Sequence, residues 1–382
     1  MRKIVICAYN LRQGGAVQVG VSLVSLYLTS IALRDSIKLC LVSSAVYKNL
    51  DIGLQKDPLI VVLNNAPRFF LLRFAYDTYI SLRYKKYVIF FIFGPCFSFD
   101  HSLPNRLALG FAEPWLLPNS IENIITKSFI SIIRSRLYQI FKTQLFRCAT
   151  FLWVETREAK LSLKSILNDR SISIEVIPNL PNQIFFNDEH PLKYSNCISY
   201  KYNIAIVGYP HVHKNLFSIF PAVKALNQIG FHFTLHLTIP FNSKHEKKMI
   251  KAANHYQVEG NICNHGCIPL SVCKSLYKEC LISVHPSLME ISSVSPMEAA
   301  LQGCELLLIN LPFNKPRYNS SAYFYEPNAS PNEIASIILE IYNAYLVNNL
   351  TRKSGALVLD LVSQRETWRL MHTELIHKLT FL

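Results

Sequence analysis

The sequence is short of charge. Charged residues make up 17% of its 382 residues, below the roughly 25% typical of soluble domains. The shortage falls on the acidic side, because 25 Asp and Glu face 39 Lys and Arg, which gives a net charge of +14. Half of the residues are apolar, so the chain can bury a large core. A basic, apolar-leaning chain favours an anionic substrate or a membrane surface as its partner.

The sequence lacks the segments typical of nucleic-acid-binding, membrane-spanning and secreted proteins. There is no Arg-rich run and no nucleic-acid module, so nucleic acid is not expected as a partner. The longest apolar helical stretch, residues 16–33, contains Gln18 and several serines. It is expected to face a core, because a membrane span needs about 20 apolar residues. Residues 1–7 enter a strand at once, without the apolar region and cleavage site of a signal peptide. A cytoplasmic location is therefore expected.

The ten cysteines contain no Cys-x-x-Cys pair. In a cytoplasmic protein they are expected to be reduced and mostly buried. Their densest cluster comprises Cys263, His265, Cys267, Cys273 and Cys280. Zinc is an alternative for this cluster, but the spacing is not that of a zinc site. We therefore expect no metal.

Apolar strands alternate with amphipathic helices along the chain, which predicts two α/β domains, each a doubly wound parallel sheet with helices on both faces. A Pro-Asn-Leu-Pro-Asn break at 178–182 is the best domain boundary. The predicted domains are 1–182 and 183–353, and residues 354–382 form a final helix that packs back on the first domain. The predicted strands are 3–9, 37–42, 59–63, 87–93, 150–155 and 172–177, then 203–208, 233–238, 261–264, 281–285 and 305–309. The predicted helices are 16–33, 67–83, 120–147 and 157–168, then 214–229, 243–256, 270–278, 296–302, 331–348 and 354–379.

The most informative segment is His285-Pro-Ser-Leu-Met-Glu290, followed by Ser295-Pro-Met-Glu298-Ala-Ala and then Gly303. A helix is predicted to begin near Ser295, and the N–H groups and dipole of a helix N-terminus suit a phosphate. A carboxylate at each edge of such a pocket can accept hydrogen bonds from sugar hydroxyls. The combination suits a nucleotide sugar, with its diphosphate on the backbone amides of Ser292, Ser293, Val294 and Ser295. As the alternative, a Ser295–Glu298 capping box explains Glu298 without a ligand, although it does not explain Glu290.

This segment resembles the paired-glutamate signature of the family 4 retaining glycosyltransferases. The resemblance implies the GT-B fold, in which two Rossmann-like domains face a central cleft. It also implies sugar transfer from a nucleotide-sugar donor with retention at the anomeric carbon, without a cofactor or a required metal. By the same resemblance, Glu290 would hold donor-sugar hydroxyls and Glu298 would hold the ribose.

Two other loops follow the family pattern. Gly14 and Gly15, between the first strand and its helix, resemble the Gly-Gly-Ala loop that lines the cleft opposite the donor diphosphate; a plain tight turn is the alternative. Gly208 opens the second loop, and Lys214 occupies the place of the lysine that neutralises the leaving phosphate. Tyr209 stands where the family has an arginine, so one cation of the usual pair is missing. His211, His213 or a residue from elsewhere could replace it.

A third block, Gly110-Phe111-Ala-Glu-Pro-Trp115, resembles part of the acceptor domain of bacterial polysaccharide glycosyltransferases. It is predicted to be a loop that binds the acceptor or the donor sugar, together with His101, although an ordinary surface histidine is an equal alternative for His101. The predicted helix over 127–147 carries basic residues among aromatic ones. It is expected either to lie on an anionic membrane or to pack on the sheet with an ordinary basic face.

Together these features predict a retaining glycosyltransferase of bacterial surface polysaccharide biosynthesis, of the lipopolysaccharide or O-antigen kind. Its expected acceptor is a lipid-linked glycan or an oligosaccharide, and its expected location is the inner face of the plasma membrane. Two other functions remain open. The first is a nucleotide-sugar epimerase on the same fold. The second is a catalytically degenerate basic protein that binds a membrane surface, which Tyr209 at the arginine position favours.

Overall fold

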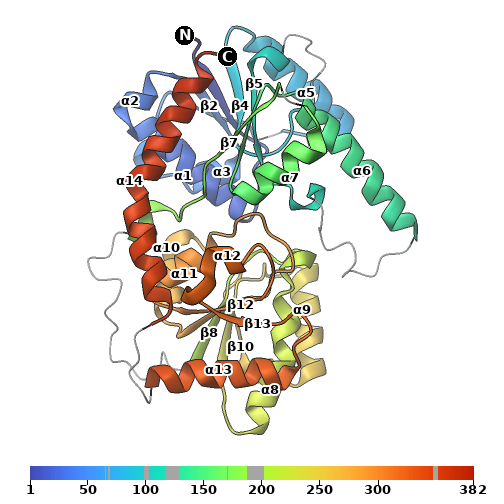
Figure 1. The fold of residues 1–382 in the computed structure, drawn as a ribbon, viewed down its shortest axis with the longest axis vertical. Coiled ribbons are helices and arrows are strands. Elements are labelled where there is room, and N and C mark those ends of the chain that lie inside the picture. The colour runs from blue at the N-terminus through green and yellow to red at the C-terminus, as the bar shows by residue number, and fades with distance from the viewer. Residues whose placement is uncertain are drawn as a thin grey trace. The chain divides into compact units, whose positions relative to one another are not determined.

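The computed structural model describes residues 1–64, 66–67, 69–98, 103–117, 129–169, 171–186, 202–346 and 352–382. The chain divides into two compact units, labelled unit 1 and unit 2 from here on (Figure 1). Unit 1 comprises Met1–Asn179 and Glu366–Leu382, and unit 2 comprises Leu180–Arg365. Helix α14, Ser354–Leu379, begins in unit 2 and ends in unit 1. The C-terminal end of the chain therefore completes the N-terminal unit.

The described residues of unit 1 form a seven-stranded parallel sheet in the order β3-β2-β1-β4-β5-β6-β7. The strands are β1 Ile4–Ala8, β2 Ile37–Val42, β3 Ile60–Val62, β4 Val88–Phe91, β5 Leu107–Phe111, β6 Phe151–Val154 and β7 Ser173–Val176. The helices are α1 Gly15–Thr29, α2 Ile31–Arg34, α3 Ser44–Lys48, α4 Ile52–Gln55, α5 Phe70–Arg83, α6 Phe129–Arg147 and α7 Arg157–Leu167. Strands β1 and β4 are buried along their whole length, as expected for a parallel sheet covered on both faces.

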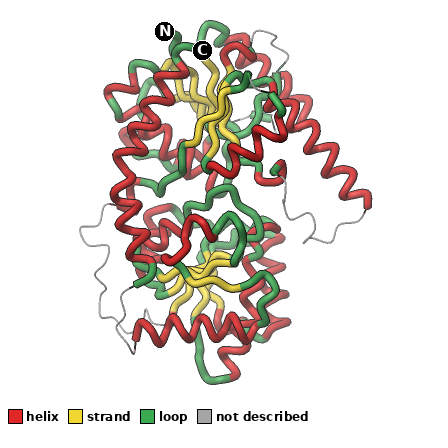
Figure 2. Tube along the Cα trace, in the orientation of Figure 1, coloured by secondary structure: helices red, strands yellow, loops and turns green. Residues whose placement is uncertain are grey.

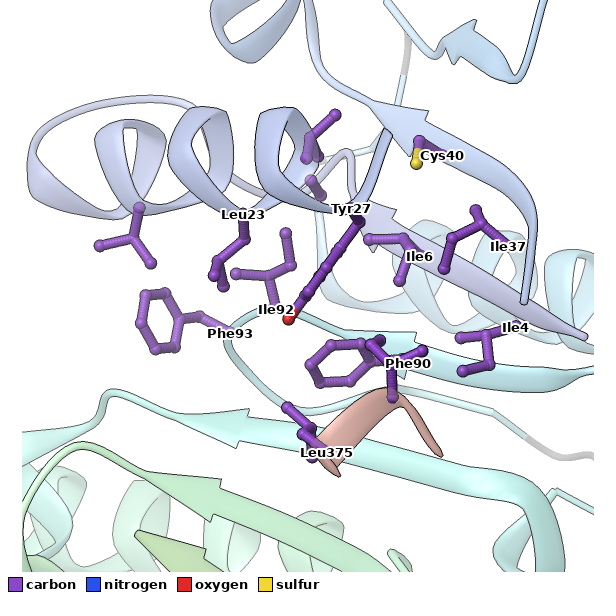
Figure 3. Packing of buried hydrophobic residues seen from close by; sticks show 14 of the residues in the cluster. Ile4, Ile6, Leu23, Tyr27, Ile37, Cys40, Phe90, Ile92, Phe93 and Leu375 are labelled. Carbon is purple, nitrogen blue, oxygen red and sulfur yellow. The ribbon is translucent and has the colours of Figure 1, made fainter. Parts of the chain in front are cut away.

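The core of unit 1 combines the central strands with α1 and the end of α14. Figure 3 shows Tyr27 of α1 among Ile6 of β1, Phe90 of β4 and Ile92 just after β4, with Leu375 of α14 nearby. The hydroxyl of Tyr27 also lies 2.9 Å from Nδ1 of the buried His372. The end of α14 is thus part of the core of unit 1.

Unit 2 repeats the same strand pattern. Its described residues form a six-stranded parallel sheet in the order β10-β9-β8-β11-β12-β13. The strands are β8 Asn203–Ile206, β9 Thr234–Leu237, β10 Ile262–Asn264, β11 Ile282–His285, β12 Glu305–Ile309 and β13 Tyr323–Tyr325. The helices are α8 Phe220–Gln228, α9 Lys244–Tyr256, α10 Leu270–Lys278, α11 Ser295–Leu301, α12 Lys315–Tyr318, α13 Pro331–Leu346 and the start of α14. In each unit the strands lie centrally and helices flank them (Figure 2), so the predicted fold class is confirmed.

The structure differs from the predicted elements at informative places. The helix predicted over 214–229 is broken into 3₁₀ helices at Val212–Lys214 and Leu216–Ile219, and α8 begins only at Phe220. Asn215 has a left-handed backbone with φ of 51°, which Asn tolerates better than most residues. Pro221 then stands in the first turn of α8, where its missing N–H matters least. The break leaves Lys214 on a short turn directly after the sheet edge.

The described surface of helix α6 carries exposed apolar side chains beside the exposed Arg136 and Arg147. Lys142 is only 8% exposed, and its Nζ forms an ion pair with Glu113 at 2.6 Å. Arg147 donates to the carbonyl of Leu167 at the end of α7. Lys127 and the side chain of Arg134 lie outside the described residues. The exposed large side chains of α6 are Leu137, Tyr138, Ile140 and Phe141. In the portions that the structure describes, no helix has the length and apolar character needed to cross a bilayer.

Candidate active site

The candidate site in unit 2 lies where the strand order reverses. Strands β8 and β11 are neighbours, and the chain moves outward from them in opposite directions. The crevice beyond the carboxyl ends of two such strands is where doubly wound sheets bind ligands. The segment from Gly208 to Lys214 follows β8, and the segment from Pro286 to Glu290 follows β11. The backbone N–H of Leu288 donates to the carbonyl of His213 at 2.7 Å. The topology thus places two predicted motifs side by side.

Lys214 and Glu290 form an ion pair within these loops. Nζ of Lys214 lies 2.5 Å from Oε1 of Glu290, although the two residues are 76 positions apart in the sequence. Their side chains are 21% and 14% exposed, so the pair is mostly but not fully shielded from solvent. A charge-assisted hydrogen bond in such surroundings is short and strong. The structure therefore brings together one cation and one carboxylate that a polar ligand can reach.

Glu298 is buried, and helix capping does not explain it. The N-cap of α11 is Val294 rather than Ser295, and none of the described side chains caps this helix. The capping-box interpretation is therefore wrong. Glu298 is 5% exposed, and burial raises the pKa of its carboxyl to about 7. A buried carboxyl in this position destabilises the fold when it is ionised. Ionisable groups with such shifted pKa values are typical of functional sites.

The Glu298 carboxyl should make stability depend on pH. Its folded pKa of about 7 lies above its ordinary value of 4.5. Its contribution to the free energy of unfolding is therefore present in full below about pH 4.5 and lost as the pH rises through about 7. We expect Glu298→Gln to exceed wild type in stability by up to about 3 kcal/mol at about pH 8 and to match it at about pH 4.5. Urea unfolding of both proteins measures this. Burial also raises the pKa of Glu305, but Glu305 is present in both proteins, so its effect cancels when their stabilities are subtracted. A stability difference that did not change with pH would contradict the expectation.

Arg317 and Tyr318 of α12 join this site, and the sequence analysis missed both. The guanidinium of Arg317 donates to the hydroxyl of Ser292. The hydroxyl of Tyr318 donates to the carbonyl of Ser293 at 3.0 Å. Burial, against the lowering effect of Arg317, raises the pKa of Tyr318 to about 12, with smaller contributions from Glu290 and Glu298. The available signal was Lys315-Pro-Arg317 closely following the strand over 305–309, since basic residues after a parallel strand lie at its ligand-binding edge.

The histidines of the loops are neutral near pH 7. Burial outweighs the charge of Glu290 and, with a smaller contribution from Lys214 in the same direction, lowers the pKa of His213 to about 4. Burial, with a smaller contribution from Lys214, lowers the pKa of His285 to about 3. Burial also lowers the pKa of His211, whose ring lies 4.7 Å from that of Tyr209. Neutral rings supply no positive charge here, whereas the guanidinium of Arg317 supplies one.

Unit 1 has its own loop at the corresponding reversal of strand order. Gly14, the N-cap of α1, has φ of 67°, in the left-handed region that favours glycine. An added Cβ at Gly15 would meet no atom within 4 Å. Asn10 donates to the carbonyl of Phe93 at 2.6 Å, which ties the loop after β1 to the loop after β4. The predicted Gly14–Gly15 loop is therefore open and lies at the ligand-binding edge of unit 1.

The acceptor block is largely structural. Gly110 and Phe111 belong to strand β5, so the prediction that they form a binding loop is wrong. A Cβ on Gly110 would lie 1.8 Å from the carbonyl oxygen of Ile92. The buried Phe111 ring packs 5.1 Å from that of Phe146. Trp115 lies in the 3₁₀ helix Pro114–Leu116 and is partly exposed. His101 lies outside the described residues.

Comparison with solved structures shows the fold class. The chain resembles an α,α-trehalose-phosphate synthase (UDP-forming) from Burkholderia vietnamiensis with a TM-score of 0.68 and 9% identity, over 100% of this chain and 98% of that one. It resembles a glycosyltransferase from Rickettsia africae with a TM-score of 0.67 and 11% identity, over 99% and 98%. It matches TarM with a TM-score of 0.58 and 12% identity, over 80% of this chain but only 58% of TarM. No family model and no curated protein matches the sequence. The chain therefore has the fold of GT-B glycosyltransferases, and identities this low establish the fold alone.

Proposed function

We propose that this chain is a glycosyltransferase that moves a sugar from a nucleotide-sugar donor to a glycan. One observation carries the proposal: the loops after β8 and β11 join Lys214 and Glu290 at 2.5 Å at the ligand-binding edge of unit 2. Two proteins that share the fold support it, one named as a glycosyltransferase and one as a UDP-forming synthase. The paired-glutamate segment supports the finer assignment to a retaining enzyme of family 4.

The proposed roles follow from the charges of the site. The ammonium of Lys214 and the guanidinium of Arg317 bind the donor diphosphate. Together they offset its negative charge, so that no metal is required. Glu290, released from Lys214, accepts hydrogen bonds from donor-sugar hydroxyls, and Glu298 accepts them from the ribose. With retention, the bond from the anomeric carbon to the leaving phosphate breaks, and the acceptor oxygen bonds to that carbon on the same face. The acceptor proton passes to the leaving phosphate oxygen, whose growing charge Lys214 stabilises.

A donor panel tests the function. UDP-, GDP- and dTDP-sugars are compared by the rise in melting temperature that each one causes, since a ligand of the folded state stabilises it. Those that bind are then incubated with and without glycan acceptors, and the products are separated. Transfer to an acceptor, or slow release of free nucleotide, supports the proposal. Isomerised donor without acceptor would identify an epimerase instead. No binding of any nucleotide would favour the degenerate binding protein.

We further propose that the acceptor is a lipid-linked glycan at the inner face of a bacterial membrane, in lipopolysaccharide or O-antigen synthesis, with the protein attached peripherally. Helix α6 supports this proposal. Leu137 is 63% and Ile140 60% exposed, beside the half-exposed Tyr138, and the exposed Arg136 precedes them. A helix with aromatic and aliphatic residues on its open face can enter the headgroup region, and a basic residue adds attraction to anionic lipid.

Co-sedimentation with liposomes measures this attachment. We expect binding to anionic vesicles that weakens at high salt, because basic residues contribute about 1 kcal/mol each near such a surface and are screened within a Debye length. A Leu137→Glu, Ile140→Glu double variant should lose most of the bound fraction. Leu359→Glu is the matched control, since Leu359 is 66% exposed on α14. Equal recovery of the double variant and wild type would leave α6 as an ordinary packed helix.

A further inference from the structure

Three metal-ligating side chains gather at one edge of the unit 2 sheet, in neighbouring strands β9 and β10. His236 of β9 pairs directly with Cys263 of β10 in the parallel register. His265 follows Cys263 by two positions, and its N–H donates to the carbonyl of Leu237, so the pairing continues past the end of β10. Side chains two residues apart on a strand share one face. All three side chains therefore lie on the same face of the sheet.

Their ligand atoms converge. Nδ1 of His236 lies 2.9 Å from Nε2 of His265, and Sγ of Cys263 lies 3.6 Å from the same Nε2. The three potential ligand atoms all lie within 4.8 Å of one another. Tetrahedral zinc has Zn–S near 2.3 Å and Zn–N near 2.0–2.1 Å, which separates a sulfur and a nitrogen ligand by about 3.6 Å and two nitrogens by about 3.3 Å. The Cys263–His265 separation already fits, and the two imidazole nitrogens need to separate by a few tenths of an ångström. Cys263 and His236, which lie within 4.8 Å of each other, must come to about 3.6 Å.

A polar contact between the two histidines leaves one ring unsatisfied. Their rings stack with centroids 5.2 Å apart, and the bond between them uses one nitrogen of each. Nε2 of His236 is buried and has no hydrogen-bond partner among the residues that the structure describes. This nitrogen is not the one that faces His265 and Cys263, so it is not itself a metal ligand, and a buried group of this kind is one that an ordered water accompanies. The contact thus does not account for the cluster as a closed structural unit.

We propose that His236, Cys263 and His265 bind a single zinc ion. A thiolate and two imidazoles are ligands that zinc prefers, and they are unsuited to magnesium or calcium. Binding would release the thiol proton of Cys263 to solvent. Cys263 and His265 are partly exposed, so water can complete the tetrahedron. The ion would join the edge strand β10 to β9, and its expected effect is on the stability of unit 2.

The sequence could not assemble this set. The cysteine-rich segment over 263–280 lacks zinc-site spacing, and His236 is 27 positions before Cys263. Only the parallel pairing of β9 with β10 brings His236 to the other two residues. The sequence-based argument against zinc in this cluster rested on spacing along the chain, and spacing does not reveal a ligand supplied by a neighbouring strand.

Metal titration of the full-length chain tests the site. The protein is stripped with a chelator, and zinc binding is measured by calorimetry. We expect one zinc per chain, with affinity at least roughly tenfold lower in Cys263→Ser and in His265→Gln. Cys267→Ser is the matched control, because Cys267 is an exposed thiol four positions from Cys263. His255→Gln controls for an exposed histidine. Equal zinc affinity in Cys263→Ser and Cys267→Ser would overturn the proposal.

Two further measurements, cobalt absorption and the melting temperature, test whether Cys263 is a ligand and whether metal binding stabilises the fold. Cobalt bound in place of zinc should show thiolate-to-metal charge-transfer absorption, and Cys263→Ser should lose it. Zinc should raise the melting temperature of wild type and of Cys267→Ser in a concentration-dependent way, and should have little effect on Cys263→Ser. Circular dichroism establishes that each variant is folded. Cobalt binding without the thiolate band, or a melting temperature indifferent to zinc, would exclude this site.

Discussion

Replacing Glu290 with alanine is expected to abolish sugar transfer while leaving the chain folded. Glu290 lies in a loop beyond the end of β11, and its carboxylate accepts a hydrogen bond from Lys214. It belongs to no helix cap and is not part of either hydrophobic core. Its removal therefore deletes a proposed acceptor of donor-sugar hydrogen bonds without opening a cavity. The interaction is expected to matter most in the transition state, where the donor sugar develops positive charge.

Turnover of Glu290→Ala and of Glu290→Gln is compared with that of Glu279→Ala, whose exposed glutamate follows α10 in the same unit. The glutamine variant keeps the shape and one acceptor oxygen but removes the charge, so intermediate activity would assign part of the effect to charge. Circular dichroism and the melting temperature establish that each variant is folded. Normal turnover by a folded Glu290→Ala protein would contradict the donor-site assignment.

Replacing Lys214 with alanine should lower turnover by about 10²–10³-fold, similar to the loss of one preorganised charge-stabilising group. The physical reason is the departing diphosphate, whose negative charge increases as the glycosidic bond breaks. Tyr209 occupies the place of one cation of the family pattern, so Lys214 is expected to carry more of this stabilisation than in relatives that have both. Lys214→Arg keeps the charge and should retain most of the activity.

Lys247→Ala is the matched control, because Lys247 is an exposed lysine of α9. A loss of turnover below about threefold in Lys214→Ala would correspond to under 1 kcal/mol of activation barrier. It would indicate that Arg317 stabilises the leaving diphosphate instead, and turnover of Arg317→Ala would then test this. The double variant of Lys214 and Glu290 should be far from additive, since the two side chains are in direct contact at 2.5 Å. Additive losses would mean that the two residues act at separate steps.

Much of the fold could be predicted from the chain because apolar periodicity is a local property. The predicted strands at 37–42 and 305–309 and the helices at 270–278 and 354–379 coincide with β2, β12, α10 and α14. Strand β5 was missed because it contains Gly110, and the block that begins at Gly110 was interpreted as a loop. The glycine is instead required by close packing against Ile92, which a local pattern does not reveal.

The candidate site likewise has parts that could be predicted from the sequence and parts that could not. Glu290 and Lys214 could be proposed from motifs, because each belongs to a short segment with a recognisable order of residues. Their contact could not, since they are 76 positions apart and meet only after β8 and β11 pair. Arg317 and Tyr318 had no motif at all. They reach Ser292 and Ser293 because β12 lies beside β11.

The sequence by itself determined the alternation of strands and helices, the two-domain α/β class and the identity of the principal charged residues, because these depend on the order of neighbouring residues. The tertiary structure alone decided which charges meet, which carboxyl is buried and which strands share an edge. Lys142 illustrates the difference, since its place on a basic helix left open a membrane contact or an ordinary basic face, whereas folding buries it against Glu113. Burial and pairing arise from strand order and packing, and these bring together residues that are distant along the chain.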